Sequence, residues 1–199
     1  MNVFSISDLH LSGLADKPMD VFGTGWENHF EKIKADWQSK VMDGDIVLIC
    51  GDISWGTVLE EGLFDLDRLK DLRGKKVFIR GNHDYWWNGI TKLRERAPDQ
   101  TFYFLQNDCV KFGNIVICGS RGWTCPGSSD YTAHDEKLYL REAERFKLCF
   151  KQVEKVFEDG DELIAMVHYP PFSRTSPCTL FTRLFEENGV KKVVFGHIH

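Results

Sequence analysis

Short runs of β-branched and aromatic residues recur along the chain and alternate with longer segments of mixed polar and apolar residues. Several of these runs are apolar at every position, which is typical of strands that are buried on both faces of a sheet. The predicted strands cover residues 3–6, 46–50, 76–79, 110–112, 115–118, 163–167 and 192–195.

The segments between these runs carry apolar residues at helical spacing. The predicted helices cover residues 27–42, 58–72, 88–96, 134–158 and 180–187. Alternating strands and helices predict βαβ units and a mostly parallel sheet with helices on both faces, so the fold class is α/β. The runs at 110–112 and 115–118 flank Gly113 and Asn114 and predict an antiparallel hairpin. We find no internal repeat and no linker, and we predict a single domain over residues 1–199.

Composition and charge exclude several classes of protein. The 199 residues are 42% hydrophobic and carry a net charge of -5, so no basic surface is available to neutralise a nucleic-acid backbone. The apolar runs are far shorter than the roughly 18 residues that a membrane span needs, and residues 1–7 lack the basic start of an export signal. The six cysteines include no C-x-x-C pair and are expected to stay reduced. We therefore expect a soluble, cytoplasmic protein without a membrane or nucleic-acid partner.

Polar side chains of the kinds that bind metals follow five of the predicted strands. In chain order these residues are Asp8, His10, Asp52, Asn82, His83, Asp84, His168, His197 and His199. Because ligands of α/β sheets bind outside the carboxyl ends of the strands, we expect these side chains at one edge of the sheet. Carboxylate, imidazole and amide donors together suit Mn, Fe or Zn. Leaving aside His83 and Asp84, seven donors are too many for one tetrahedral ion and suffice for two if a carboxylate bridges the ions.

A charge count indicates phosphate as the substrate. Two divalent ions together with Asp8 and Asp52 would leave a charge of about +2, or about +1 with a bridging hydroxide. The rest of the chain is acidic, so the ions rather than the protein surface would attract the anion.

The motifs D-x-H, G-D, G-N-H-D, H and G-H-x-H, in this order from Asp8 to His199, resemble those of the calcineurin-like metallophosphoesterase superfamily. The first motif, I-S-D-L-H-L at residues 6–11, is similar to that of bacterial phosphohydrolases of the phosphodiesterase type. The resemblance implies a layered fold with central mixed, mostly parallel sheets flanked by helices, and a metal site at the carboxyl ends of the strands.

The resemblance also implies a role for each motif residue. Asp8, His10 and His199 would bind the first ion, Asp52 would bridge, and Asn82, His168 and His197 would bind the second. His83 would contact the phosphate or protonate the leaving oxygen, and Asp84 would orient the His83 ring. The implied reaction is in-line attack of a metal-bridging hydroxide on phosphorus. The family usually continues past the last histidine, so we expect the chain to be truncated at its C-terminus.

Further side chains after the predicted strands are candidates for contacts with substrate. Arg80, Arg121 and Arg174 could bind a phosphate group, although solvated or ion-paired arginines are the alternative. The tryptophans that follow strand ends could form a rim that stacks a base or an aryl group, and packing in the core is the alternative. These tryptophans are Trp55, Trp86, Trp87 and Trp123.

The sequence favours hydrolysis of a phosphodiester or a small organic phosphate. Protein Ser/Thr phosphatases of the superfamily extend the second motif to G-D-x-x-D-R and use G-N-H-E, whereas this chain has G-D-I-S-W-G and G-N-H-D. A catalytically silent scaffold on the same fold is the alternative, but such a scaffold would be expected to lack His83 or some of the ligands. A nuclease is disfavoured by the acidic balance and by the absence of a basic segment.

Overall fold

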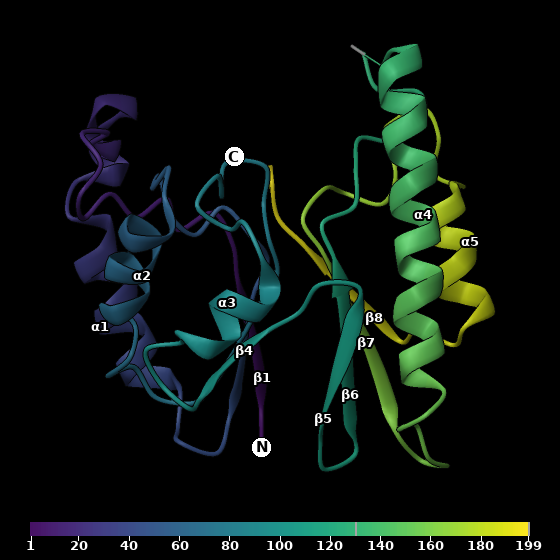
Figure 1. Ribbon diagram of the computed structural model, residues 1–199, viewed down its shortest axis with the longest axis horizontal. Helices are drawn as coiled ribbons and strands as arrows, with labels where there is room; N and C mark the ends of the chain where they lie inside the picture. The colour runs from purple at the N-terminus through teal and green to yellow at the C-terminus, as the bar shows by residue number, and fades with distance from the viewer. Residues whose placement is uncertain (130, 199) are drawn as a thin grey trace. The chain divides into compact units, whose positions relative to one another are not determined.

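The β-branched and aromatic runs form two four-stranded sheets (Figure 1). The computed structural model describes residues 1–129 and 131–198. The chain divides into two units, the first made of residues 1–78 and 82–104 and the second of residues 79–81 and the chain from Leu105 onward. The predicted α/β class, with mostly parallel sheets flanked by helices, is confirmed.

The sheet of the first unit is entirely parallel, with the order β1-β2-β3-β4. Its strands are β1 (Val3–Ile6), β2 (Ile46–Ile49), β3 (Lys75–Phe78) and β4 (Phe102–Phe104). Its helices are α1 (His29–Lys40), α2 (Leu59–Asp67) and α3 (Ile90–Glu95), and 3₁₀ turns cover Met19–Phe22 and Thr24–Trp26. Ile6 is level with Ile49, and Ile49 with Phe78, so these strands end at one edge of the sheet.

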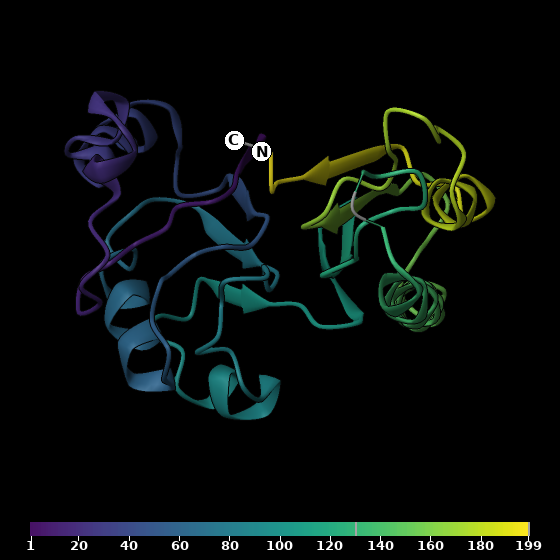
Figure 2. The same cartoon turned by 90° about the horizontal axis from the view of Figure 1, so that it is seen from above.

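The core of the first unit packs the sheet against its helices (Figure 2). Val47 and Ile49, which point to the same face of β2, belong to one buried cluster with Trp37 of α1 and Leu66 of α2. Alternate residues of a strand share a face, so this cluster explains why one face of the sheet is covered by helices. The buried packing holds the ends of β1, β2 and β3 in place.

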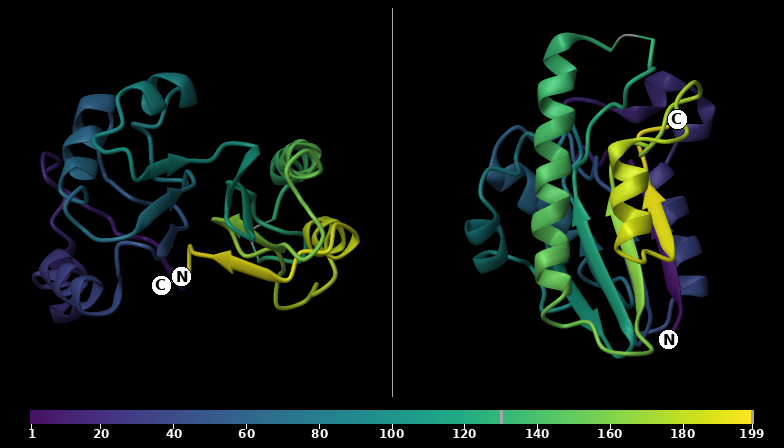
Figure 3. Two further views of the ribbon diagram at one scale, coloured as in Figure 1. Left: turned by 90° about the horizontal axis from the view of Figure 1, so that it is seen from below. Right: turned by 90° about the vertical axis from the view of Figure 1, so that its right-hand side faces the viewer.

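The sheet of the second unit has the order β5-β6-β7-β8 and begins with the predicted hairpin. Its strands are β5 (Asp108–Phe112), β6 (Ile115–Ser120), β7 (Glu162–Val167) and β8 (Lys192–Phe195). The pair β5 and β6 is antiparallel, and β6, β7 and β8 are parallel. Helices α4 (Ala133–Val153) and α5 (Leu180–Glu187) lie side by side along this sheet (Figure 3).

Three features differ from the expectation. The alternation of strands and helices predicted one sheet, but β5 pairs with β6 and starts a second sheet instead of extending the first. In each unit the buried cluster that the helices share with the sheet lies against one face of the sheet, whereas the alternation predicts helices on both faces. Strand β4 was missed because its run, Phe102–Phe104, has only three residues. The single domain over residues 1–199 stays a prediction.

Candidate metal centre

The loops that follow β1 and β2 run side by side and bring three predicted ligands together. The amide of Asp8 donates to the carbonyl of Gly51 (3.0 Å), and the amide of His10 donates to the carbonyl of Asp52 (3.0 Å). One residue further, the amide of Leu11 donates to the carbonyl of Ile53 (2.9 Å). These bonds continue the β1–β2 pairing beyond the strands, so backbone hydrogen bonds hold the two motifs in register.

Asp8, His10 and Asp52 form a compact group of metal-ligating side chains. One ligand atom from each lies within 4.8 Å of the others, and His10 and Asp52 are buried. His10 Nε2 is 3.9 Å from Asp8 Oδ1 and 4.0 Å from Asp52 Oδ2. An imidazole and two carboxylates are ligands that suit divalent Mn, Fe or Zn, so the residues present fit such an ion.

The backbone at these positions is unusual. Asp8, His10 and Asp52 have φ angles of 56°, 46° and 51°, in the left-handed region that residues other than glycine rarely adopt. His197, another predicted ligand, has a φ of 71°. Such conformations are kept only where the surrounding structure imposes them, and they cluster at functional sites.

The motif after β3 is anchored to the same loops. The amide of His83 donates to Asp52 Oδ1 (2.8 Å). Asp84, which is fully buried, accepts at Oδ1 from the amides of Ile53 (2.8 Å) and Ser54 (3.2 Å) and from the indole of Trp86 (3.0 Å). Asp84 therefore fixes the backbone directly after Asp52, a role that the sequence did not suggest. Its expected effect on the His83 ring stays a prediction.

Aromatic rings surround the imidazoles of this unit. Trp55 stacks on His10 with ring centroids 4.7 Å apart and 18° between the planes, and it lies 4.6 Å from the His83 ring. The ammonium group of Lys17 lies 4.6 Å from the centre of the Trp55 ring. Of the four tryptophans considered for a rim, Trp55 is the one that touches both histidines.

Two supporting residues, His29 and Asp65, lie outside the motifs of the sequence. His29 Nε2 is hydrogen-bonded to the carbonyl of Leu9 (3.0 Å), between Asp8 and His10 in the chain. Asp65, buried on α2, accepts from the hydroxyl of Ser54 (2.6 Å) and from the amide of Gly13 (2.9 Å). No sequence signal separates Asp65 from the exposed acids beside it, because its burial depends on tertiary packing.

The second unit contributes a histidine pair at the ends of β7 and β8. The rings of His168 and His197 have centroids 5.2 Å apart, and His168 is fully buried. The amide of His168 donates to the carbonyl of Arg121 (2.9 Å), and the amide of Gly196 donates to the carbonyl of His168 (3.1 Å). The ends of β6, β7 and β8 are thus joined by backbone bonds. His199, the remaining predicted ligand, lies outside the described residues.

The residues considered for substrate contacts have different surroundings. Trp86 is fully buried in the core of the first unit, as is Trp87, so packing is the role that the structure gives both. Trp123 is partly buried and donates from Nε1 to Asp135 (2.9 Å). Arg121 is 19% exposed, and Arg174 is exposed in the segment before α5.

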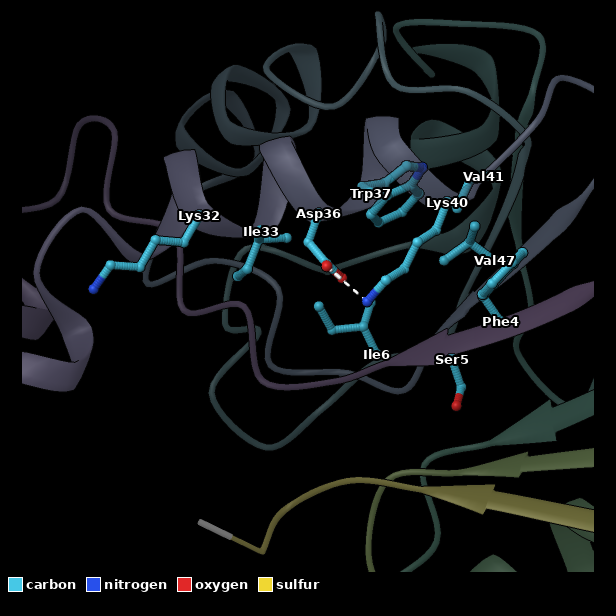
Figure 4. A pocket seen from close by; sticks show the side chains of 10 residues that line it. All are labelled: Phe4, Ser5, Ile6, Lys32, Ile33, Asp36, Trp37, Lys40, Val41 and Val47. Atoms are coloured by element: carbon cyan, nitrogen blue, oxygen red, sulfur yellow. Dashed lines mark ion pairs between the residues drawn. The ribbon is translucent and has the colours of Figure 1, made fainter.

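A groove of about 340 Å³ lies between α1 and β1 of the first unit (Figure 4). Its walls are largely apolar and include Phe4, Ile33 and Trp37, and an ion pair between Lys40 and Asp36 (2.7 Å) lies beside them. None of the predicted metal ligands lines this groove. Its chemistry is therefore separate from that of the Asp8, His10 and Asp52 group.

Comparisons with known proteins bear on the whole chain. The sequence pattern of the family described as calcineurin-like phosphoesterase matches residues 1–199. Two proteins from different strains of Helicobacter pylori, each named uncharacterized metallophosphoesterase, are 26% and 24% identical over 157 residues. Those matches cover 78% of this chain and 36% of either relative, so the chain spans about a third of the length of these curated relatives.

A crystal structure of a protein of unknown function from Aquifex aeolicus is similar at a TM-score of 0.44 and 18% identity, over 97% of this chain and 88% of that one. Among the described residues, no helix combines the length and the hydrophobicity needed to cross a bilayer. Since the family pattern extends over residues 1–199 and the chain carries a group of side chains that could hold a metal ion, the protein belongs to the calcineurin-like phosphoesterase family.

Proposed function

We propose that the chain hydrolyses a phosphoester, either a phosphodiester or a small organic phosphate, with the help of two divalent metal ions. The observation that carries the proposal is the group formed by Asp8, His10 and Asp52, whose ligand atoms lie within 4.8 Å of one another. Family membership supports the same chemistry, because its members are named for phosphoester hydrolysis.

The proposed ligands follow the motifs of the family. Asp8, His10 and His199 would hold the first ion, Asn82, His168 and His197 would hold the second, and Asp52 would be the carboxylate shared by the two ions. The ions are Mn, Fe or Zn, which the mixture of imidazole and oxygen donors favours. When bound, such ions supply Lewis-acid charge that activates water and stabilises the oxygens of the phosphoryl group.

The chain's own residues position the reacting groups. We assign His83 as the side chain that contacts the phosphate or protonates the leaving oxygen. The backbone amide of His83 donates a hydrogen bond to Asp52 Oδ1 (2.8 Å), which holds His83 next to the loop that carries Asp52. The ring centroids of Trp55 and His83 are 4.6 Å apart. Asp84 supports this arrangement by accepting hydrogen bonds from the backbone amides of Ile53 and Ser54.

Arg121, Arg174 and Trp123 are the proposed substrate contacts. Trp86 is left out because its side chain is fully buried. A silent scaffold is not favoured, since His83 and the proposed ligands are all present in the sequence. The cytoplasmic location expected from the sequence stays a prediction.

Hydrolysis of aryl phosphodiesters and aryl phosphomonoesters between about pH 7 and 9, with added Mn, tests this function. We expect turnover by the wild type and a loss of at least about a hundredfold in Asp52→Asn, because a bridging carboxylate would be lost. Asp36→Asn is the matched control, since this aspartate is exposed on α1 and pairs only with Lys40 among the described residues. Absence of turnover with Mn, Fe and Zn alike would overturn the proposal.

A further inference from the structure

A cluster of charged side chains in the second unit has more positive than negative charge. Glu142 of α4 is fully buried, and Arg121 and Arg145 form ion pairs with it. Arg145 is in direct contact with Glu142 Oε1, while Ser120 Oγ donates to Oε2 (3.2 Å). Arg121 is further away, with Nη2 3.8 Å from Oε1. Glu142 is therefore shared among Arg145, Ser120 and Arg121.

The guanidinium of Arg121 is held away from water. Its side chain is 19% exposed and lies against Trp123, with Cζ 4.7 Å from the ring centroid. The positive charges of Arg80 and Arg145 act on this guanidinium, and the charge of Glu142 opposes them. Like charges in a largely buried place are costly to keep together unless an anion joins them.

Arg80 reaches the same region from the end of β3. Gly119 of β6 makes this possible, because a Cβ at that position would lie 2.7 Å from Cγ2 of Ile79, the residue before Arg80. Within residues 1–129 and 131–198, neither arginine donates a side-chain hydrogen bond, and the Nε atoms of Arg80 and Arg121 are both buried without an acceptor. Buried donors nearly always have acceptors in folded proteins, so a bound anion is a fitting acceptor for these two donors, which the described residues leave without one.

The arginines lie beside the histidine pair of the same unit. The carbonyl of Arg121 accepts the amide of His168 (2.9 Å). The side chains are also in contact. The ring centroids of Trp123 and Tyr169 are 5.1 Å apart, and those of Tyr169 and His197 are 4.4 Å apart. A ligand held by Arg121 would therefore lie close to residues that we propose as metal ligands.

We propose that Arg80 and Arg121 form a binding site for a phosphate dianion, namely a terminal phosphate group of the substrate. The charges of Arg80 and Arg145 act on Arg121, and Glu142 is the one carboxylate that pairs with Arg121 and Arg145, so a dianion would balance the two positive charges left over. Guanidinium groups bind phosphate through paired donors, which would give the buried Nε atoms their acceptor. The identification of the phosphate as part of the substrate rests on the proposed function. Such a site would favour substrates with a terminal phosphate over simple diesters.

Binding of inorganic phosphate to the metal-free 199-residue chain, in EDTA, tests this site by titration calorimetry. We expect the wild type to bind phosphate and to bind dimethyl phosphate, a monoanion, at least about tenfold more weakly. Arg80→Gln and Arg121→Gln should each weaken phosphate binding by at least about tenfold. Arg141→Gln, at an exposed position on α4, is the matched control and should bind as the wild type does.

Removal of an unbalanced buried charge should leave the fold intact, and thermal unfolding in phosphate-free buffer checks this. Should a glutamine variant unfold, Arg80→Lys and Arg121→Lys keep the charge and lose the forked donors, and they too should bind phosphate more weakly. Absence of phosphate binding in the wild type, or equal binding in folded variants and wild type, would overturn the site. Because no metal is present, these results do not depend on turnover, so failure of the site and failure of the proposed hydrolysis are distinguishable.

Discussion

Asp8, His10 and Asp52 adopt left-handed backbone conformations, and this sets the geometry of the candidate metal centre. Each such conformation costs on the order of 1–3 kcal/mol, and the surrounding hydrogen bonds have to impose it. The amides of Asp8 and His10 are both bonded to the loop after β2. The motifs identified these residues in the sequence, but their φ angles could not be predicted, because they result from pairing between loops that are distant in the chain.

Asp84 is the residue on which the backbone after Asp52 depends. Asp84→Ala removes the acceptor of three buried donors, the amides of Ile53 and Ser54 and the indole of Trp86. We expect a loss of at least about 3 kcal/mol in the free energy of unfolding, measured in urea, because each unsatisfied buried donor costs about 1–3 kcal/mol.

Asp84→Asn should lose much less stability, since the amide oxygen can accept the same donors. Asp67→Ala, at an exposed aspartate that pairs with Lys70 (2.9 Å), is the control and should change stability by less than about 1 kcal/mol. If the urea concentration at the unfolding midpoint of Asp84→Ala equals that of the wild type, Asp84 does not hold the backbone at Ile53 and Ser54.

Lys76 of β3 predicts a pH dependence of stability. It is 1% exposed, and burial lowers its pKa to about 8, although Asp99, Asp71 and Asp43 oppose the effect. Between about pH 8 and 10.5 the unfolded chain binds more protons at this site than the folded chain does, so stability rises with pH in this range. Relative to Lys76→Met, the wild type should gain about 2 kcal/mol between pH 7 and 10.

Urea unfolding of both proteins at each pH measures this gain. Lys92→Met is the control, because this lysine is exposed on α3. A constant difference in stability between wild type and Lys76→Met across the whole range would contradict the argument.

At the scale of elements, the period of apolar residues predicted most strands and helices, because burial of one helix face or of a whole strand leaves a repeat in the sequence. Strand β8 (Lys192–Phe195) and helix α5 (Leu180–Glu187) agree with their predicted ranges. The division into two sheets was not predictable, because strand order depends on contacts between distant segments. Strand β4 was missed for a different reason, since three residues are too few to show a period.

Helix α2 contains a glycine whose role is steric. A Cβ at Gly62 would lie 2.1 Å from Cδ2 of Trp86, a fully buried ring. Alanine is the better helix former by about 1 kcal/mol, yet we expect Gly62→Ala to destabilise the protein by about 2 kcal/mol or more, because the helix and the ring must separate. Thermal and urea unfolding measure the change.

Gly89→Ala serves as the control, because nothing lies within 4 Å of a Cβ at that position. It should change stability by less than about 1 kcal/mol. A Gly62→Ala variant at least as stable as the wild type would show that α2 and Trp86 are not packed as described.

At the scale of the whole molecule, the proposed ligands are distributed over both units. Asp8, His10, Asp52 and Asn82 belong to the first unit, and His168 and His197 belong to the second. The sequence indicated these residues because each follows a predicted strand. The structure groups the ligand atoms of Asp8, His10 and Asp52 in the first unit and the rings of His168 and His197 in the second. The supporting contacts of Asp65 and His29 could not be predicted, since they join segments without a motif.

The central claim is a two-ion metal centre that depends on Asp52. Elemental analysis of metal bound per chain after mild purification, on wild type beside Asp52→Ala and the exposed control Asp36→Ala, tests it most directly. The account predicts about two transition-metal ions per chain in wild type and control, and a sharp fall in Asp52→Ala. A wild-type chain that binds no metal even after addition of Mn or Zn, or an Asp52→Ala variant that binds as much as the wild type, would contradict it.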